Sequence, residues 1–431
     1  MNTGVILLVV FLLMILLRIP VSVALLMSTL AAALYADVNV IVLVKEFWSE
    51  LNGFTLLAIP LFMLAGNLME SGGVTRRMAN FANSAVGHLP GALGHVVIIC
   101  NMLLAGVSGS GAADAVAVGG MFIPAMREEK YPDELSAAIN AASATMGPII
   151  PPSTIMVMYA ACSGLSTGAM FLAGVIPGII VGLTQILIVY FYAKNKGIVS
   201  KREKMSVKVM LRAFLSCLPA ILVPVIIIAG IAAGFFTATE ASMVACVYCI
   251  LVCFFVYKSL RPKDLIPIFI KTAKSAAPCL FCVGTAGAFC WMMSYLSIPA
   301  QLTAFLMPLV KNTTGMLLLL TGVFIIVGMF MDPLPAIVIF YPMINSMAQA
   351  VGAPPMHVAI VVNLMLCFGL MTPPYGLTLL ISSQIAKVHV LKVAKVLIPF
   401  YIVFICIVFV VIFMPDVALF LPKLLMPASF T

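Results

Sequence analysis

Two proline pairs interrupt long apolar segments of the chain, and no other feature limits its possible folds as strongly. The first pair lies in residues 147–153, Gly-Pro-Ile-Ile-Pro-Pro-Ser, and the second in residues 369–376, Gly-Leu-Met-Thr-Pro-Pro-Tyr-Gly. Because proline lacks a backbone N–H and its ring clashes with the preceding turn, neither segment can continue as one helix. The freed amides and carbonyls are tolerated at membrane depth only where protein or water surrounds them. Paired breaks in two halves of a chain therefore indicate a transporter's binding site.

The composition places these segments in a membrane. Of the 431 residues, 64% are hydrophobic and 9% are charged, which is typical of an all-α polytopic membrane protein and not of a soluble domain. In a membrane protein, the positive charges that give a net charge of +9 report membrane topology and do not indicate a nucleic-acid partner. The sequence has no HExxH motif, and no base is placed near Gly109-Ser110-Gly111, so it does not favour an enzyme.

The two halves of the chain show the same order of segments. Each is expected to hold three membrane spans, a flat interfacial arm helix, a re-entrant hairpin, a broken helix and a final span. In the first half, residues 1–193, these segments are 1–17, 20–36, 51–69, 74–86, 91–126, 133–163 and 167–193. A single long, tilted helix over residues 1–36 is the alternative to the first two spans. A basic linker, residues 194–212, follows. In the second half, residues 213–431, they are 213–235, 238–257, 275–296, 299–311, 315–351, 356–386 and 396–414.

Local sequence and charge indicate that the halves are inverted repeats. Asp114 lies ten residues before Pro124, as Asp332 lies ten before Pro342. Each half has an odd number of spanning helices, so the second half must run in the opposite direction. With the linker in the cytoplasm, the inner segments carry twenty Lys and Arg residues and the outer segments three. This bias predicts that both chain ends are outside, that the first hairpin opens inwards and that the second opens outwards.

Each hairpin tip carries one isolated acid. Asp114 and Asp332 are each the only charged residue of a long apolar stretch. A lone acid at membrane depth costs about 2.5–3.5 kcal/mol on insertion scales, so it needs a reason. We favour a structural one, because Asp332 precedes Pro333 as an N-cap does and Asp114 falls in the first turn of the returning helix. Direct binding of a cation or proton is the alternative. The two roles are compatible if capping holds the tip loop in a shape that binds an ion.

The tips and breaks also supply uncharged oxygen ligands. Ser108 and Ser110 offer hydroxyl groups, and the neighbouring glycines permit carbonyls to turn inward. The broken helices add carbonyls near residues 147–150 and 369–371. Such a set of neutral oxygens is suited to sodium.

The same breaks expose helix N-termini at Ser153 and Gly376, whose amides can hold a carboxylate. No arginine lies between Arg127 and Arg202, and none follows Arg261, so neither broken helix carries one. A substrate carboxylate must then meet amides, hydroxyls, bound sodium, or an arginine from elsewhere in the fold. We favour the first three.

Several short motifs together resemble one family of membrane proteins. On these motifs the chain resembles, over nearly its whole length, the large membrane subunit of tripartite ATP-independent periplasmic (TRAP) transporters, in the ion-transporter superfamily. Tyr375 stands where that family often has valine and is a candidate for tuning the substrate. Ala238 replaces a common proline. The motifs are Ala58-Ile59-Pro60-Leu61-Phe62 with Ala65-Gly66, Ser108-Gly109-Ser110, Pro124-Ala125-Met126, Ile150-Pro151-Pro152-Ser153, Ala173-Gly174-Val175-Ile176-Pro177-Gly178, Thr239-Glu240-Ala241, Gly328 to Asp332, and Thr372-Pro373-Pro374.

The resemblance implies sodium-coupled import across the bacterial inner membrane. Such a subunit pairs with a small four-helix membrane subunit and receives its substrate from a periplasmic binding protein. The substrate would be an organic acid, such as a C4-dicarboxylate, sialic acid or another sugar acid. Hairpins and broken helices would slide as one body against a scaffold, which is an elevator mechanism. A stand-alone sodium/carboxylate or cation antiporter of the same superfamily, or a channel, remains an alternative.

The resemblance also implies the site residues. One sodium ion would be held by Ser108, Gly147, Ile150 and Pro152, and a second by Gly328, Gly369, Met371 and Thr372. The substrate would lie between the two tips. The candidate substrate-binding residues are Ser108, Gly109, Ser110, Ser153, Asp332, Thr372, Pro373, Tyr375 and Gly376, with Asp114 and Asp332 as structural or ion-binding acids.

Overall fold

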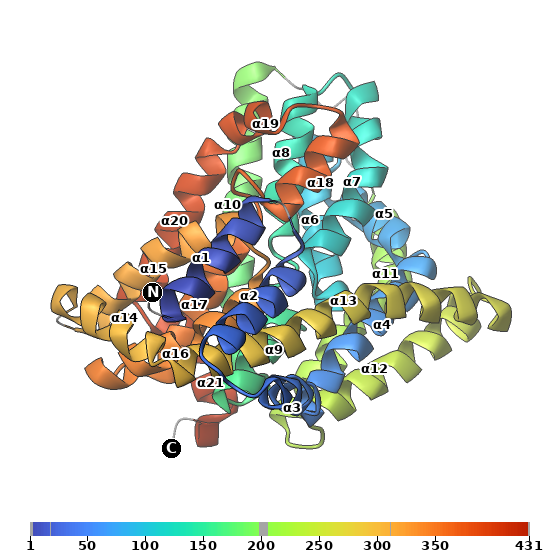
Figure 1. The fold of residues 1–431 in the computed structure, drawn as a ribbon. Coiled ribbons are helices and arrows are strands. Elements are labelled where there is room, and N and C mark those ends of the chain that lie inside the picture. The colour runs from blue at the N-terminus through green and yellow to red at the C-terminus, as the bar shows by residue number, and fades with distance from the viewer. Residues whose placement is uncertain (1–2, 18, 198–205, 311, 430–431) are drawn as a thin grey trace.

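A computed structural model describes residues 3–17, 19–197, 206–310 and 312–429, and all regular elements in these ranges are helices (Figure 1). The first half contains α1 (Thr3–Leu16), α2 (Val21–Tyr35), α3 (Val40–Leu51), α4 (Ala58–Ser71), α5 (Val74–Val86), α6 (Ala92–Ser108), α7 (Gly111–Glu128), α8 (Asp133–Ala144), α9 (Thr154–Ser163) and α10 (Thr167–Lys196). The second contains α11 (Val207–Ala232), α12 (Ala238–Leu251), α13 (Pro262–Tyr295), α14 (Ile298–Leu306), α15 (Thr313–Phe330), α16 (Pro333–Val351), α17 (Pro355–Gly369), α18 (Leu377–Ala386), α19 (Val390–Val396), α20 (Ile398–Phe413) and α21 (Asp416–Leu425).

Many of these helices have the length and composition of membrane spans. Within the described ranges, seven helices are long and apolar enough to cross a membrane, or up to nine if two bent pairs each count as one span. The pairs are α18 with α19, bent by 109°, and α20 with α21, bent by 57°. Large apolar side chains such as Phe191 and Phe413 are exposed on the outer surface, as lipid contact requires. The protein is therefore an all-helical, multi-pass membrane protein.

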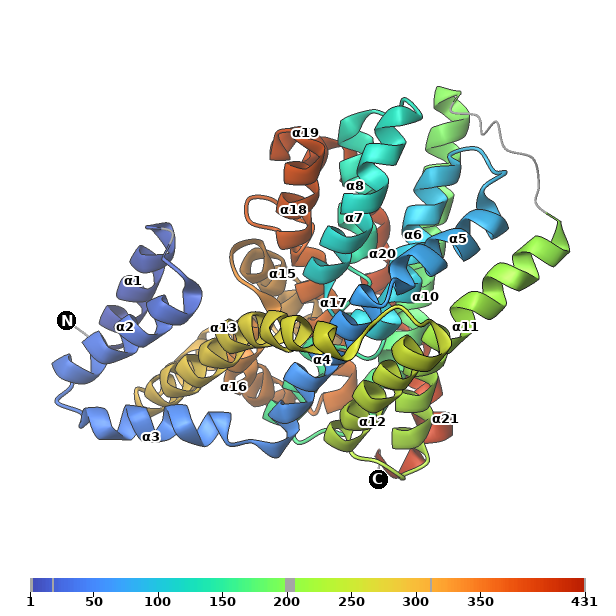
Figure 2. The same ribbon diagram turned by 90° about the vertical axis from the view of Figure 1, so that its right-hand side faces the viewer.

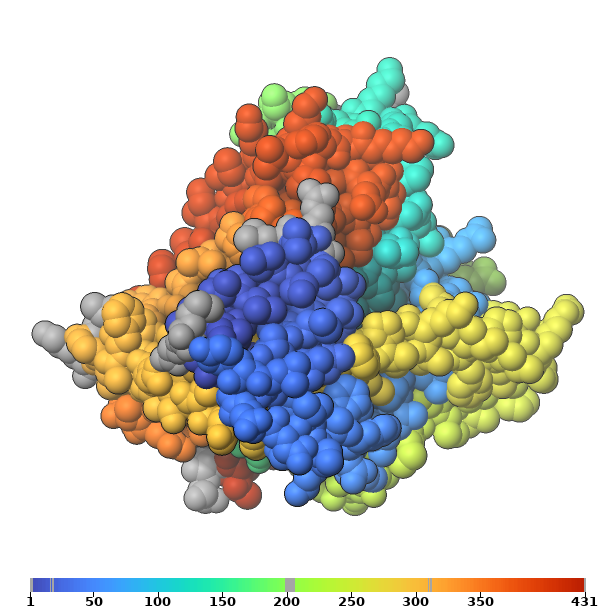
Figure 3. All heavy atoms as spheres, viewed as in Figure 1, coloured from blue at the N-terminus to red at the C-terminus, as the bar shows by residue number. Residues whose placement is uncertain are grey.

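The helices form two groups, which we call the frame and the central bundle. The frame comprises α1–α4 and α11–α13, in which α13 packs against α2, α3 and α4, and α4 packs against α12. The central bundle comprises α6–α10 and α15–α21. Figure 2 shows α1, α2 and α3 standing apart from the central bundle on the side of α13, and Figure 3 shows the same frame helices covering the middle of one face. The short α5 and α14 contact both groups.

In the central bundle, each hairpin lies against the broken helix of the other half. Helices α6 and α7 meet at Gly109 and Ser110, and α15 and α16 meet at Met331 and Asp332. Helix α18 packs against α7 and α8, while α9 packs against α16. Both proline pairs, 151–152 and 373–374, have cis peptide bonds. This crossed packing brings the two breaks and the two tips towards the middle of the bundle.

Helix α13 is longer than the span expected at residues 275–296. It begins at Pro262, because the Arg261 N–H donates to the Asp264 carboxylate at 2.8 Å and proline suits the first helical position. At 34 residues it is about 50 Å long, which exceeds the hydrocarbon core of about 30 Å. Lys263, Lys271 and Lys274, expected in a cytoplasmic loop, therefore lie along this helix.

Other boundaries also differ from expectation. Helices α1 and α2 are separate, so a single helix over residues 1–36 is excluded, but at 14 and 15 residues each is shorter than a full span. Helix α10 ends and α11 begins inside the expected 194–212 linker, of which residues 198–205 lie outside the described residues. Arg18 and Lys311 also lie outside them. The expected last span, 396–414, is preceded by α19 and followed by α21.

Several basic segments gather at one end of the molecule. The α7–α8 turn, the end of α10 and α19 lie together at the top in Figures 1 and 2, whereas α3 and α21 lie at the bottom. The top elements carry Arg127, Lys130, Lys194, Lys196, Lys392 and Lys395. The basic α12–α13 turn and the first part of α13 lie at mid-height instead, so the orientation in the membrane stays a prediction.

Two glycines join the second tip to the second break. A Cβ at Gly369 would lie 2.6 Å from the carbonyl oxygen of Gly328, and a Cβ at Gly328 would lie 3.0 Å from the Gly369 Cα. Only a residue without a side chain permits this approach of two backbones.

Gly369→Ala should therefore destabilise the protein, because the added methyl group meets backbone that cannot move aside; overpacking typically costs about 1–3 kcal/mol. Gly322→Ala in α15 is the matched control, since a Cβ there meets nothing within 4 Å. Thermal unfolding of the purified protein in detergent should show a lower midpoint for Gly369→Ala only. Equal midpoints for both variants would contradict the close contact.

Candidate functional site

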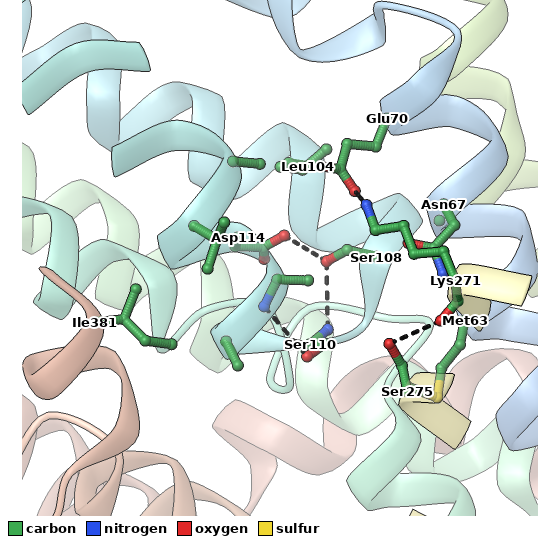
Figure 4. Close-up of a pocket in the computed structure, with 15 residues that line it drawn as sticks. Met63, Asn67, Glu70, Leu104, Ser108, Ser110, Asp114, Lys271, Ser275 and Ile381 are labelled. Carbon is green, nitrogen blue, oxygen red and sulfur yellow. Dashed lines mark hydrogen bonds and ion pairs between the residues drawn. The ribbon is translucent and has the colours of Figure 1, made fainter. Parts of the chain in front are cut away.

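A small hydrogen-bond network holds the first hairpin tip. The Ser108 Oγ donates to Asp114 Oδ1 at 2.5 Å, and the Ser110 N–H donates to Ser108 Oγ at 3.3 Å (Figure 4). Ser110 is the N-cap of α7, where its Oγ accepts from the Ala113 N–H at 3.5 Å. Asp114 lies in the first turn of α7, as expected, but Ser110 supplies the cap. The Asp114 carboxylate instead fixes the conformation of the tip through Ser108.

The other Asp114 oxygen faces the first break. The Asp114 side chain is fully buried, and its Oδ2 has no hydrogen-bond partner in the described part of the chain. A Cβ at Gly147 would meet this oxygen, so glycine lets the break approach the carboxylate. Gly109 of the tip also lies against the break, because a Cβ there would meet the Pro152 carbonyl oxygen. In addition, Thr154 Oγ1 donates to the Gly109 carbonyl at 3.2 Å. Tip and break therefore form one oxygen-rich site.

These contacts bring together three of the four residues expected at the first sodium site, Ser108, Gly147 and Pro152. The fourth, Ile150, lies in the intervening turn, with its N–H donating to the Met146 carbonyl at 2.8 Å. A buried carboxylate oxygen without a partner, beside hydroxyl and carbonyl oxygens, has the chemistry that hard cations require.

The second tip and break are joined in the same way. Besides the Gly328–Gly369 contact, the Tyr375 N–H donates to the Met329 carbonyl at 3.2 Å. The Met371 carbonyl accepts from the Tyr401 hydroxyl at 2.8 Å. Of the residues expected at the second sodium site, Gly328 and Gly369 therefore meet at the tip–break contact, while Met371 and Thr372 lie in the break.

Thr372 has a structural bond in this conformation. Its Oγ1 donates to the Phe368 carbonyl one turn earlier, at 2.8 Å, and its side chain is buried. The hydroxyl proton is thus used by a backbone carbonyl freed near the break, while the oxygen lone pairs remain as ligands. This geometry suits coordination of a cation better than donation to a substrate carboxylate.

Asp332 is the N-cap of α16, as its place before Pro333 predicts. Its Oδ1 accepts from the Leu334 N–H at 3.1 Å. Unlike Asp114, it is exposed, and it lines a cavity of about 360 Å³ together with Ser110. A smaller cavity, of about 60 Å³, is lined by Gly109, Ser110 and Asp332, so it lies between the two tips.

Two cavities separate the tips from the frame. One, of about 330 Å³, lies between the first tip and helices α4 and α13 (Figure 4). It shares Met63, Ser110, Ala112 and Ser275 with the 360 Å³ cavity, so the two adjoin and together reach from one tip to the other.

The frame side of this cavity was not predicted from the sequence. It is formed by Asn67 and Glu70 of α4 and by Lys271 and Ser275 of α13. Lys271 Nζ donates to Glu70 Oε2 at 2.8 Å, and Asn67 Nδ2 donates to Thr272 Oγ1 at 3.0 Å. The one available signal was the polar pair Asn67 and Glu70 near the end of an apolar span.

The remaining expected substrate residues do not line these two cavities. Ser153 is buried as the N-cap of α9, donating to the Pro148 carbonyl at 2.6 Å and accepting from the Met156 N–H at 3.2 Å. Thr372 and Pro373 lie in the second break, and Gly376 is the N-cap of α18. Tyr375 is 44% exposed and packs near Phe330, with ring centroids 6.4 Å apart.

A multi-pass helical protein with two broken helices, two hairpins and a cavity between the hairpin tips belongs to the class of membrane transporters. Residues 8–417 match the family model described as "Tripartite ATP-independent periplasmic transporter, DctM component". The chain belongs to this family, and it is therefore a large membrane subunit of a TRAP transporter, as the motifs predicted.

Curated relatives extend over nearly the full chain. The chain is 36% identical to the sialic acid TRAP transporter large permease protein SiaM of Vibrio cholerae, over 88% of this chain and 89% of that protein. It is 33% identical to the C4-dicarboxylate TRAP transporter large permease protein DctM of Pseudomonas aeruginosa, over 92% of each.

Solved structures show the same fold at low sequence identity. The YdaH transporter of Alcanivorax borkumensis has a TM-score of 0.63 and 16% identity, over 86% of each chain. MtrF of Neisseria gonorrhoeae has a TM-score of 0.60 and 14% identity, over 89% of this chain and 86% of that one.

Removing the Asp332 cap should destabilise the second tip. Asp332→Ala leaves the Leu334 N–H without its acceptor, and loss of such a cap costs about 0.5–2 kcal/mol. Asp332→Asn keeps an acceptor oxygen and should unfold close to the unaltered protein. Thermal unfolding in detergent measures the difference, and an equal loss in both variants would assign the effect to charge instead of capping.

Proposed function

We propose that this protein imports an organic acid across the bacterial inner membrane, driven by sodium. Membership of a family of secondary transporters supports the proposal, as do relatives named for sialic acid and C4-dicarboxylates. The observation that carries it is the adjoining pair of cavities between the two tips and the frame, because a transported molecule must contact both a moving and a fixed part.

The oxygens at the two tip–break contacts support sodium coupling. The first site would use Ser108, Gly147, Ile150 and Pro152, with Asp114 as its charged neighbour. The second would use Gly328, Gly369, Met371 and Thr372. Each set combines backbone carbonyls with one hydroxyl, which are ligands for a hard cation and not for a soft one.

The substrate would lie in the cavities between the tips, in contact with Ser110, Gly109 and Asp332. Ser108 also lines the first cavity. We retain Pro373, Tyr375, Gly376 and Ser153 as residues that shape the breaks behind these contacts, because they do not line the two cavities.

The two halves would act as inverted repeats in an elevator mechanism. Their helices follow the same order, from the flat α5 and α14 through the hairpins to the broken helices. The central bundle would move against the frame, with α5 and α14 as arms, since these contact both groups. The charge distribution supports a cytoplasmic 194–212 linker and external chain ends.

A small four-helix membrane subunit and a periplasmic binding protein would complete the transporter. The family is named for a tripartite system, which supports this assembly over a stand-alone antiporter or a channel. The test is uptake of succinate or sialic acid into proteoliposomes that hold both membrane subunits, with the binding protein added outside. Uptake in sodium-free, proton-only buffer equal to that with a sodium gradient would contradict the proposal.

Ser108→Ala should weaken the sodium dependence of uptake, because it removes one oxygen ligand and frees the Asp114 carboxylate. The half-saturating sodium concentration should rise about ten-fold, as expected for one hydrogen bond or ligand to a charged group. Ser136→Ala is the control: Ser136 is also buried and donates to the Pro132 carbonyl at 3.2 Å, away from both tips. A Ser108→Ala transporter with unchanged sodium dependence would remove Ser108 from the site.

Thr372→Val should likewise raise the half-saturating sodium concentration by about ten-fold, whereas Thr372→Ser should preserve it, because only valine lacks the oxygen. Thr321→Val is a matched control. Thr321 is also buried and donates to a carbonyl one turn earlier, that of Leu317, at 2.8 Å. If both valine variants behave alike in sodium titrations of uptake, the Thr372 hydroxyl has only the structural bond seen here.

A further inference from the structure

The cavity beside the first tip has a single cationic side chain. Among the described residues that line the two cavities between the tips and the frame, Lys271 is the one Lys or Arg, while Glu70, Asp114 and Asp332 are acids. Lys271 belongs to α13 of the frame and Asp114 to the opposite wall (Figure 4). An anion in this space therefore meets a positive charge on the frame side only.

Lys271 forms an ion pair with Glu70, and this pair can open. Lys271 Nζ and Glu70 Oε2 are 2.8 Å apart, and the two side chains are 50% and 33% exposed. Ion pairs with this much exposure are weakly held, because water and salt screen them and both side chains lose rotamer freedom. A substrate carboxylate offers the lysine the same chemistry as Glu70 does, so the two carboxylates compete for one ammonium group.

The pair is also not needed to hold the two frame helices together. Asn67 Nδ2 donates to Thr272 Oγ1 at 3.0 Å between the same two helices, and Thr272 in turn donates to the Ile268 carbonyl at 2.9 Å. The nearby Arg77 is already engaged, since it donates to the Gly72 and Gly73 carbonyls and stacks on the Tyr257 ring. Lys271 is thus the cation that remains for a ligand.

We propose that Lys271 is the frame-side contact for an anionic group of the transported molecule, and that Glu70 occupies it while the cavity is empty. The inference rests on the proposed function in that the anion is the organic acid. It adds a specificity-determining residue outside the hairpins and broken helices, which carry no arginine of their own in this region. Selection for an acid over a neutral analogue would come from this lysine.

The first test needs no knowledge of the substrate. Ser275 lies one turn after Lys271, lines both cavities and donates to the Lys271 carbonyl at 3.1 Å. In a Ser275→Cys protein, peptide mass spectrometry would give the modification rate of that thiol by an anionic reagent, sulfonatoethyl methanethiosulfonate, and by its cationic trimethylammonium counterpart. The ratio of the two rates reports the charge that an anion meets in the cavity.

Lys271→Met should lower the anionic-to-cationic ratio by about three- to ten-fold, and Glu70→Gln should raise it, because the two charges act in opposite directions at short range. Lys274→Met is the matched control, since Lys274 is exposed on the same helix and does not line the cavities. Both effects should diminish in about 1 M salt. A ratio that Lys271→Met leaves unchanged, or that Lys274→Met lowers equally, overturns the proposal.

The second test uses uptake of succinate and of sialic acid in the complete transporter. Lys271→Met should raise the KM by about ten-fold without changing the half-saturating sodium concentration, and Lys271→Arg should restore the KM. Glu70→Gln should lower the KM. A purely structural ion pair would instead make both Lys271→Met and Glu70→Gln less stable and slower, in the same direction, and that result would overturn the proposal. If the unaltered protein carries neither acid, these two substrates are excluded, and the thiol ratios still decide the role of Lys271.

Discussion

The need to satisfy freed backbone groups at two helix breaks governs the rest of this structure. At the first break, the Pro148 carbonyl accepts from Ser153 Oγ at 2.6 Å and from Asn363 Nδ2 at 3.4 Å. At the second, the Leu370 carbonyl accepts from Thr378 Oγ1 at 2.8 Å. Without water in the hydrocarbon region, each such group would otherwise cost several kcal/mol. The polar residues near each break are therefore structural first, and what they leave free is available to an ion.

Hydrogen bonds from polar side chains to such groups also connect the two halves of the chain. Asn363 reaches from α17 to the first break, and Asn140 Nδ2 donates both to the Ala115 carbonyl at 3.0 Å and to Ser382 Oγ at 2.9 Å. At the basic end, Arg127 donates to the Ala386 carbonyl at 2.8 Å. Apart from the Asn140–Ala115 bond, which lies within the first half, these bonds join first-half and second-half helices inside the central bundle. Within the frame, the Asn67–Thr272 bond does the same for α4 and α13. The elevator motion proposed above would require such bonds within each group.

The sequence predicted the central bundle well because its breaks and turns depend on local chemistry. Proline pairs, glycines at tips and acids before helices act over a few residues, so α8, α9 and both hairpins fall close to the expected segments. The frame was predicted less well. The charged residues before position 275 led us to expect that α13 starts there. Instead, the Asp264 side chain caps the helix at Arg261, so α13 starts more than three turns earlier. The sequence shows that a lysine is near a membrane surface, but not which side of a long helix it occupies.

The charges around the cavity would favour the cation coupling proposed above. Glu70, Asp114 and Asp332 face a space with Lys271 as its one described cation, and Glu70 already takes that lysine. A carboxylate entering between Asp114 and Asp332 adds a like charge where the effective dielectric constant is low, which is unfavourable by itself. Two cations bound at the tip–break contacts would offset the two tip acids, so each ion would favour the binding of the acid and the acid would favour the ions equally. In the proposed function, the substrate and sodium would then be linked through the electric field in one cavity, without direct contact between them.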